Sequence, residues 1–179
     1  MRKSVYRAAA GCYDKEKGGE TVSGTEFEIH EGVLRRYTGR SGRVTIPSEV
    51  TEIGEEAFAG CAPLASVTFP AGLRVIGAGA FSHCTHLRWV KLPEGLRTVG
   101  ARAFYGCTHM MSVSLPTGLE CIGSEAFAHC STLESVTIPD SVADVGENVF
   151  ARCHKLREVR VSEAWKAAHP DLYEKLMKR

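Results

Sequence analysis

The sequence lacks the features that mark several large classes of protein. It has no apolar run approaching the roughly 20 residues of a membrane-spanning helix, so we expect no membrane insertion. It has no excess of charge of either sign, because 22 lysines and arginines face 21 acidic residues. Nucleic-acid-binding proteins usually concentrate a basic excess on one face, so we expect no nucleic-acid partner.

We also expect no export signal in the N-terminal segment. The stretch MRKSVYRAAAGCYDKEK places basic and small residues before Cys12. A signal peptide needs an apolar run of about 7 to 15 residues, and Arg7 interrupts the only candidate. If Met1 is the natural start, we expect a cytoplasmic protein; the alternative is an extracellular or cell-surface location.

The cysteine count argues against a full set of disulfides. Seven cysteines are an odd number, and no targeting segment accompanies them. This usage favours reduced thiols. The rest of the composition, 44% hydrophobic and 24% charged over 179 residues, is typical of one globular unit.

What the sequence does contain is a 23-residue repeat, and four of its columns hold without exception over five units. Proline occupies 47, 70, 93, 116 and 139, glycine 54, 77, 100, 123 and 146, phenylalanine 58, 81, 104, 127 and 150, and cysteine 61, 84, 107, 130 and 153. One unit reads L-x-x-V-x-[IFL]-P-x-x-[VL]-x-x-[IV]-G-x-x-A-F-x-x-C-x-x.

The stretches VTIPSEVTEIGEEAFAGCAPL and VTIPDSVADVGENVFARCHKL, and the pattern over residues 44 to 161 as a whole, closely resemble the BspA-type class of leucine-rich repeats. The resemblance implies a non-catalytic module that binds protein on its concave sheet. Secreted relatives are similar to adhesins that hold host matrix proteins.

The repeat predicts the fold without the family. The L-x-x-V-x-I segment alternates apolar residues at period two, which indicates a short strand with one buried face. The proline that follows has no N–H and ends the strand at the same place in each unit. We therefore expect an α+β repeat solenoid, a right-handed leucine-rich-repeat coil with a parallel concave β-sheet and short strands or 3₁₀ turns on the convex side.

The invariant columns have predicted roles inside this coil. Equivalent residues of stacked coils lie roughly 4.8 Å apart, so the phenylalanines should form an aromatic column and the cysteines a column of compact buried side chains. The glycines should permit a tight turn. The segment A-F-x-x-C fits a short helical or 3₁₀ turn.

The two ends of the solenoid should differ from its repeats, because they must cover open edges. We divide the chain into a flexible tail (1–23), a solenoid (24–161) and a C-terminal helical cap (162–179). The solenoid comprises an N-terminal cap (24–43), where Phe27 and Ile29 alternate like a strand, and five units (44–158). An amphipathic partner helix is the alternative for the C-terminal segment.

The run His83, Cys84, His86 offers the ligand types that zinc prefers. Because Cys84 belongs to the repeated column, we interpret it as structural and expect no metal and no cofactor. His86 should stack over His109 on the next coil. Cys121 lies outside the cysteine column and should be the most reactive thiol. No nucleophile has a positioned base, so we do not expect an enzyme.

Function is predicted on the exposed positions of the concave sheet. Most of these residues are small or hydroxylated; the exceptions gather near the middle. The candidate binding residues are Arg88, Trp89, Lys91, Met111, Ser66 and Ser112. Tryptophan and arginine dominate interface energetics, which favours a protein or peptide ligand of mildly acidic character. Two alternatives stay open: Trp89 packs across Ser66 and Ser112, or the chain self-associates through a solenoid end or the C-terminal helix.

Overall fold

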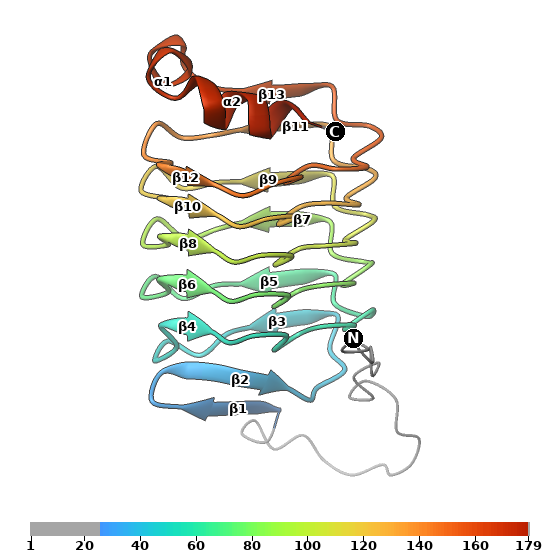
Figure 1. Ribbon diagram of the computed structural model, residues 1–179. Coiled ribbons are helices and arrows are strands. Elements are labelled where there is room, and N and C mark those ends of the chain that lie inside the picture. Colours follow the sequence, from blue (N-terminus) through green and yellow to red (C-terminus); the bar gives the residue numbers. More distant parts are fainter. Residues whose placement is uncertain (1–25, 179) are drawn as a thin grey trace, which may run out of the picture.

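The computed structural model describes residues 26–178 and shows a parallel β-solenoid of about six turns (Figure 1). A hairpin of β1 (Phe27–His30) and β2 (Val33–Tyr37) begins it. Three-residue strands follow once per coil: β3 (Arg43–Thr45), β5 (Ser66–Thr68), β7 (Trp89–Lys91), β9 (Ser112–Ser114), β11 (Ser135–Thr137) and β13 (Glu158–Arg160). Two-residue strands alternate with them: β4 (Glu52–Ile53), β6 (Val75–Ile76), β8 (Thr98–Val99), β10 (Cys121–Ile122) and β12 (Asp144–Val145). Helices α1 (Glu163–Ala168) and α2 (Pro170–Met177) end it.

The six three-residue strands form one side of the solenoid, which we call the long-strand face. They pair in parallel, β3 with β5, β7 with β9 and β11 with β13, each in the register of the repeat. The middle residue of each strand points inward; Val90, for example, is 3% exposed. This is the sheet that the alternating pattern predicts.

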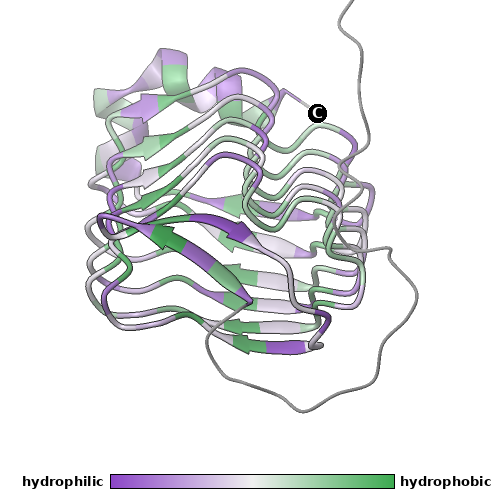
Figure 2. Cartoon of the chain, turned by 90° about the horizontal axis from the view of Figure 1, so that it is seen from below, coloured by the Kyte–Doolittle hydropathy of each residue, from purple (hydrophilic) through white to green (hydrophobic). Residues whose placement is uncertain are grey.

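The two-residue strands build a second side, and it carries the more continuous ladder. Its seven strands have the order β1-β2-β4-β6-β8-β10-β12, with only the β1–β2 pair antiparallel. The first residue of each short strand is partly or fully exposed and the second, such as Ile76, is buried. Seen from below, the coils repeat one shape, each offset from the one before it (Figure 2).

The third side, the turn wall, contains residues 55–61 and their equivalents in the later coils. It differs from the expected 3₁₀ turn because two of its columns have left-handed backbone, as at Glu56 (φ 54°) and Gly60 (φ 70°). Left-handed residues interrupt a right-handed helix, so alternate N–H groups point along the solenoid axis instead. The N–H groups of Glu56, Phe58 and Gly60 donate to carbonyls of the next coil, and the same three bonds recur from coil to coil at 2.7–3.0 Å.

The invariant glycines serve close packing rather than a special turn conformation. The glycine φ values in the left-handed region belong to other positions, such as Gly60 and Gly106. A Cβ on Gly123 would lie 2.4 Å from the backbone N of Ala101, and one on Gly146 would lie 2.2 Å from the N of Ser124. The reason given above, a tight turn, is therefore wrong: any side chain here would push neighbouring coils apart.

The predicted aromatic column runs through the core. Successive rings from Phe58 to Phe150 lie 4.8–5.8 Å apart between centroids and are nearly parallel. Tyr37 and then Phe27 extend it into the N-terminal hairpin, at 4.9 and 5.3 Å. The core therefore continues beyond the repeats into the hairpin that covers their first edge.

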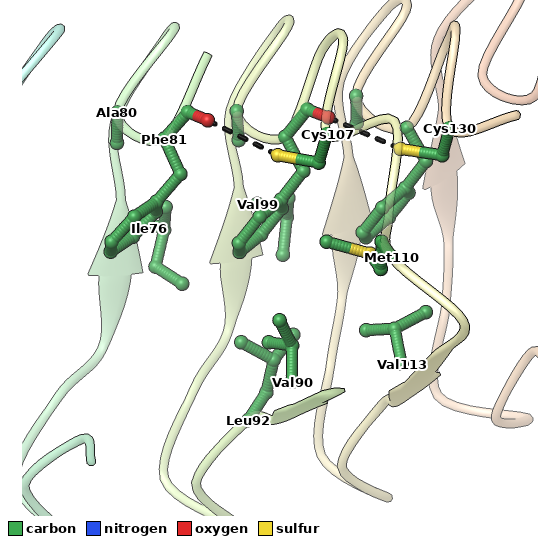
Figure 3. Packing of buried hydrophobic residues seen from close by; sticks show 14 of the residues in the cluster. Ile76, Ala80, Phe81, Val90, Leu92, Val99, Cys107, Met110, Val113 and Cys130 are labelled. Atoms are coloured by element: carbon green, nitrogen blue, oxygen red, sulfur yellow. Dashed lines mark hydrogen bonds between the residues drawn. The ribbon is translucent and has the colours of Figure 1, made fainter. Parts of the chain in front are cut away.

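The cysteine column is buried, as expected, but it also makes a specific contact. The Sγ–H of Cys107 donates to the Phe81 carbonyl oxygen at 3.2 Å, and Cys130 bonds to Phe104 in the same way (Figure 3). Cys84 and Cys153 repeat the arrangement. Burial raises the pKa of the Cys107 and Cys130 thiols well above the usual range, which keeps the proton available for this bond.

At the C-terminal end, α1 and α2 pack on the last coil. Ser162 accepts the Trp165 N–H and caps α1. Trp165 is 3% exposed and its Nε1–H donates to the Val142 carbonyl at 2.7 Å, while Leu176 of α2 is fully buried. Between residues 26 and 178, no helix has the length and apolar character needed to cross a membrane. The predicted tail (1–23) lies outside the described residues.

Candidate binding surface

The candidate residues lie together at the middle of the long-strand face. Trp89 and Lys91 are the outward residues of β7, and Ser112 of β9 pairs directly with Trp89. Ser66 is in β5, which contacts β7 on its other side. Arg88 and Met111 directly precede β7 and β9. We name these six residues the Trp89 patch.

Trp89 projects into solvent because its neighbours cannot cover it. The side chains on either side of it, Ser66 and Ser112, are too short to reach across an indole. Trp89 is 59% exposed and Met111 is 44% exposed. Among the described residues, Met177 is the one other large hydrophobic residue that is exposed. The patch therefore keeps apolar surface open to water, which is typical of an interaction site.

A hollow of about 140 Å³ opens beside the patch. It is lined by Arg88, His109, Met111, Thr132, Glu134 and Lys155. Sequence analysis included only Arg88 and Met111 of these. The others are found by following the columns one coil onward, since Glu134 is the repeat equivalent of Met111 and Thr132 that of His109. The hollow adjoins the patch on the side of Arg88 and Met111.

The charges of the long-strand face are mostly positive. Its basic residues are Arg43, Arg88, Lys91, Arg157 and Arg160, and its acidic residues are Glu134 and Glu158. Glu158 and Arg160 pair with each other at 2.7 Å, a contact that lowers the pKa of the Glu158 carboxyl. Because this pair is self-neutralised, the remaining face has a cationic excess around Trp89.

His86 and His109 stack as predicted. The rings of His86 and His109 lie 5.6 Å apart and nearly parallel. Each Nδ1 faces a backbone carbonyl oxygen, that of Ala62 at 2.8 Å and that of Thr85 at 2.7 Å. A carbonyl only accepts, so both Nδ1 atoms carry the proton. In the described part of the chain, no three His, Cys, Asp or Glu side chains gather in a way that could hold a metal.

Cys121 is the most accessible of the six cysteines in residues 26–178. Its reactivity is limited, because partial burial and the neighbouring Asp144 and Glu120 carboxylates raise the pKa of its thiol. A raised pKa lowers the thiolate fraction at neutral pH. Reagents can therefore reach Cys121 more easily than the buried cysteines, but its surroundings do not activate the thiol.

Comparison with solved structures supports this architecture. The chain is 32% identical to a leucine-rich repeat protein of T. pallidum, covering 79% of this chain and 72% of that one with a TM-score of 0.75. It is 30% identical to a leucine-rich repeat protein from Bacteroides ovatus (85% and 42% covered, TM-score 0.67) and 32% identical to the pneumococcal vaccine antigen PcpA (70% and 31% covered, TM-score 0.63). The chain thus spans less than half the length of the last two. The comparison with curated proteins gives no match.

The model of the BspA type leucine rich repeat region matches residues 36–166 in six copies. Repeats of this kind commonly mediate binding, and the family is typically non-catalytic. The match covers most of the chain; it begins near the end of β2 and contains all five regular units. The chain belongs to the BspA-type leucine-rich repeat family.

Proposed function

We propose that this chain is a binding module without catalytic activity that holds a protein or peptide segment on the long-strand face. The observation that carries the proposal is the 59% exposure of Trp89 at the centre of a face otherwise made of small, hydroxylated and charged side chains. Large aromatic residues next to arginine supply most of the energy in protein interfaces. Trp89 and Met111 contact apolar side chains of the partner, and Arg88 and Lys91 contact its carboxylates.

The role of the small residues is to leave room. Because Ser66 and Ser112 have short side chains, the surface on both sides of Trp89 lies close to the strand backbone. A bound segment can therefore contact the edge of the indole and the backbone at the same time. Their hydroxyls offer hydrogen bonds to the same segment. The hollow beside Met111 then accepts one of its side chains.

Assembly through the solenoid ends, the alternative function, draws less support from the described residues. The apolar residues of the C-terminal helices are used within the chain, since Trp165 and Leu176 are buried and Leu172 and Tyr173 pack against the core. At the other end, β1 pairs with β2. We expect a monomer by size-exclusion chromatography with light scattering; a dimer that persists in the Trp89→Ala variant would favour the alternative.

The proposal is tested with displayed random peptides selected on the wild-type chain. Enriched peptides should combine acidic and apolar residues, and their affinity should fall at least tenfold for an Arg88→Ala, Trp89→Ala, Lys91→Ala variant. The matched control is Arg35→Ala, Arg36→Ala, which removes exposed arginines from β2. Equal affinity for the triple variant and the wild type would contradict a binding role of the Trp89 patch.

Of the two locations expected from the sequence, the cell surface draws support from the likeness to a vaccine antigen. A partner of the Trp89 patch would then be met outside the cell.

A further inference from the structure

A second cavity lies on the turn wall, away from the Trp89 patch, and it has a volume of about 310 Å³. It exists because one column changes size from coil to coil. Tyr105 is followed in that column by Ala128 and Ala151, so the wall becomes hollow above the tyrosine ring. The result is a short groove with two alanines as its floor and Tyr105 closing one end.

The walls of this groove are polar. Glu125 and Asn148 come from the column on one side of the alanines, and His129 and Arg152 come from the column on the other. All four have left-handed backbone, with φ between 56° and 60°. Other coils place Gly60, Gly79 and Gly106 in these columns, where glycine is conformationally less costly.

The closed end of the groove is held rigid by internal contacts. Arg102 Nε donates to Glu125 Oε2 at 2.6 Å, and its guanidinium lies over the Tyr105 ring at 5.0 Å from the centroid. The Tyr105 ring also contacts His83 and His129. Arg102 and Glu125 therefore neutralise each other, and Glu125 still has oxygen lone pairs that can accept from a ligand hydroxyl.

The open end carries uncompensated positive charge. Arg152 is exposed, and it takes part in none of the ion pairs formed by residues 26–178. Asn148 also lines the groove, and its amide adds donors. A carboxylate fits this end, because Arg152 supplies one positive charge and Asn148 supplies neutral donors.

We propose that this groove binds a sugar acid, that is, a hexuronic acid either free or as a residue of an acidic polysaccharide. The ring carboxylate pairs with Arg152 and Asn148, the hydroxyls bond to Glu125 and His129, and the C–H face of the ring lies on Ala128 and Ala151. Tyr105 closes one end of the groove, so the site holds one ring at a time. The volume accommodates one such ring with its substituents.

The test is a titration of the full chain with sodium D-glucuronate, followed by the ¹H–¹⁵N NMR shifts of backbone amides. We expect saturable shifts centred on Tyr105, His129 and Arg152.

Arg152→Gln should weaken binding at least tenfold, since it removes a charge-assisted hydrogen bond. Ala151→Tyr, which places a second tyrosine in the column of Tyr105 two coils further along the groove, should abolish binding while leaving every charge in place. Arg157→Gln, an exposed arginine of the long-strand face, is the control and should bind as the wild type does.

Three further ligands decide the chemistry. Glucose and N-acetylglutamate amide test whether the ring or the carboxylate alone is enough, and either one binding as tightly as glucuronate would overturn the proposal. Inorganic phosphate binding more tightly than glucuronate would overturn it as well. Polygalacturonate distinguishes the sources: tighter binding per uronate than the monosaccharide indicates a polysaccharide, and equal or weaker binding indicates the free sugar acid.

Discussion

The inside and the outside of each coil have opposite patterns of variation. The phenylalanine and cysteine columns are identical in five coils, whereas the column of Trp89 reads Arg43, Ser66, Trp89, Ser112, Ser135 and Glu158. An interior side chain has its own copies as neighbours above and below, so a change in one coil disturbs two others. An outward side chain contacts mainly water and short neighbours. The stack thus fixes the interior and leaves each outward position free to acquire a binding role.

The largest expected effect comes from breaking the interior column. Phe104→Ala removes a fully buried ring that stacks on Phe81 and Phe127. We expect the free energy of unfolding in urea to fall by about 3–5 kcal/mol. A loss below about 1 kcal/mol would contradict a tightly packed aromatic column.

Alkaline pH should lower the free energy of unfolding, because the buried cysteine thiols resist ionisation in the folded state. Burial raises the folded-state pKa of Cys107 and Cys130, so the folded state holds these protons after the unfolded chain has lost them. Their contribution is complete below the ordinary thiol pKa of about 8.5 and declines above it, by about 1.4 kcal/mol per pH unit for each thiol. Urea unfolding at several pH values measures the slope. A Cys107→Ser, Cys130→Ser variant, which has no thiol to titrate at these positions, should show a shallower one; an identical slope would contradict the assignment.

A smaller change separates the two roles of the cysteine column. Cys107→Ala removes both volume and the donor to the Phe81 carbonyl, and we expect a loss of about 1–3 kcal/mol. Cys107→Ser keeps a donor and should lose less. If serine proves costlier than alanine in urea unfolding, the column is kept for apolar volume and the Sγ–H contact has little weight.

The smallest effect is expected outside. Trp89→Ser replaces a 59% exposed side chain by the residue found on the neighbouring strands, so the free energy of unfolding should change by no more than about 0.5 kcal/mol. Thermal and urea unfolding followed by circular dichroism measure it. A loss above about 1 kcal/mol would mean that Trp89 packs on the strand face, and it would weaken the proposed binding role.

The sequence predicts the parts of the molecule that follow its period. The long-strand face, the stacked phenylalanines, the buried cysteines and the His86–His109 pair all follow from spacing by 23 residues. The repeat does not predict that Tyr37 stacks on Phe58, because the two residues are 21 positions apart rather than 23 in the shortened hairpin coil. Periodicity cannot reveal such a partner.

The two candidate sites differ in how far the sequence predicts them, because each combines side chains from several columns of the repeat. The Trp89 patch could be outlined from the sequence because its residues stand on strands with a known alternation. The groove on the turn wall could not, since it requires the left-handed backbone at Glu125 and His129 to set two walls on either side of Ala128. The sizes of the side chains at equivalent positions predict a hollow only when the direction of each side chain is known.

The backbone hydrogen bonds of the turn wall all run one way along the solenoid axis, which gives this wall an electrical polarity of its own. In a β-sheet the peptide dipoles largely cancel because neighbouring groups point in opposite directions. On the turn wall, the rows that begin at Glu56, Phe58 and Gly60 all donate toward the C-terminal end, so their dipoles add as they do in an α-helix. Rows on the other sides of the coil run the opposite way, since the N–H groups of Gly77, Arg97 and Met111 and their equivalents donate to the preceding coil. The opposing dipoles offset one another over the solenoid as a whole, so the polarity of the turn wall acts only on groups close to that wall.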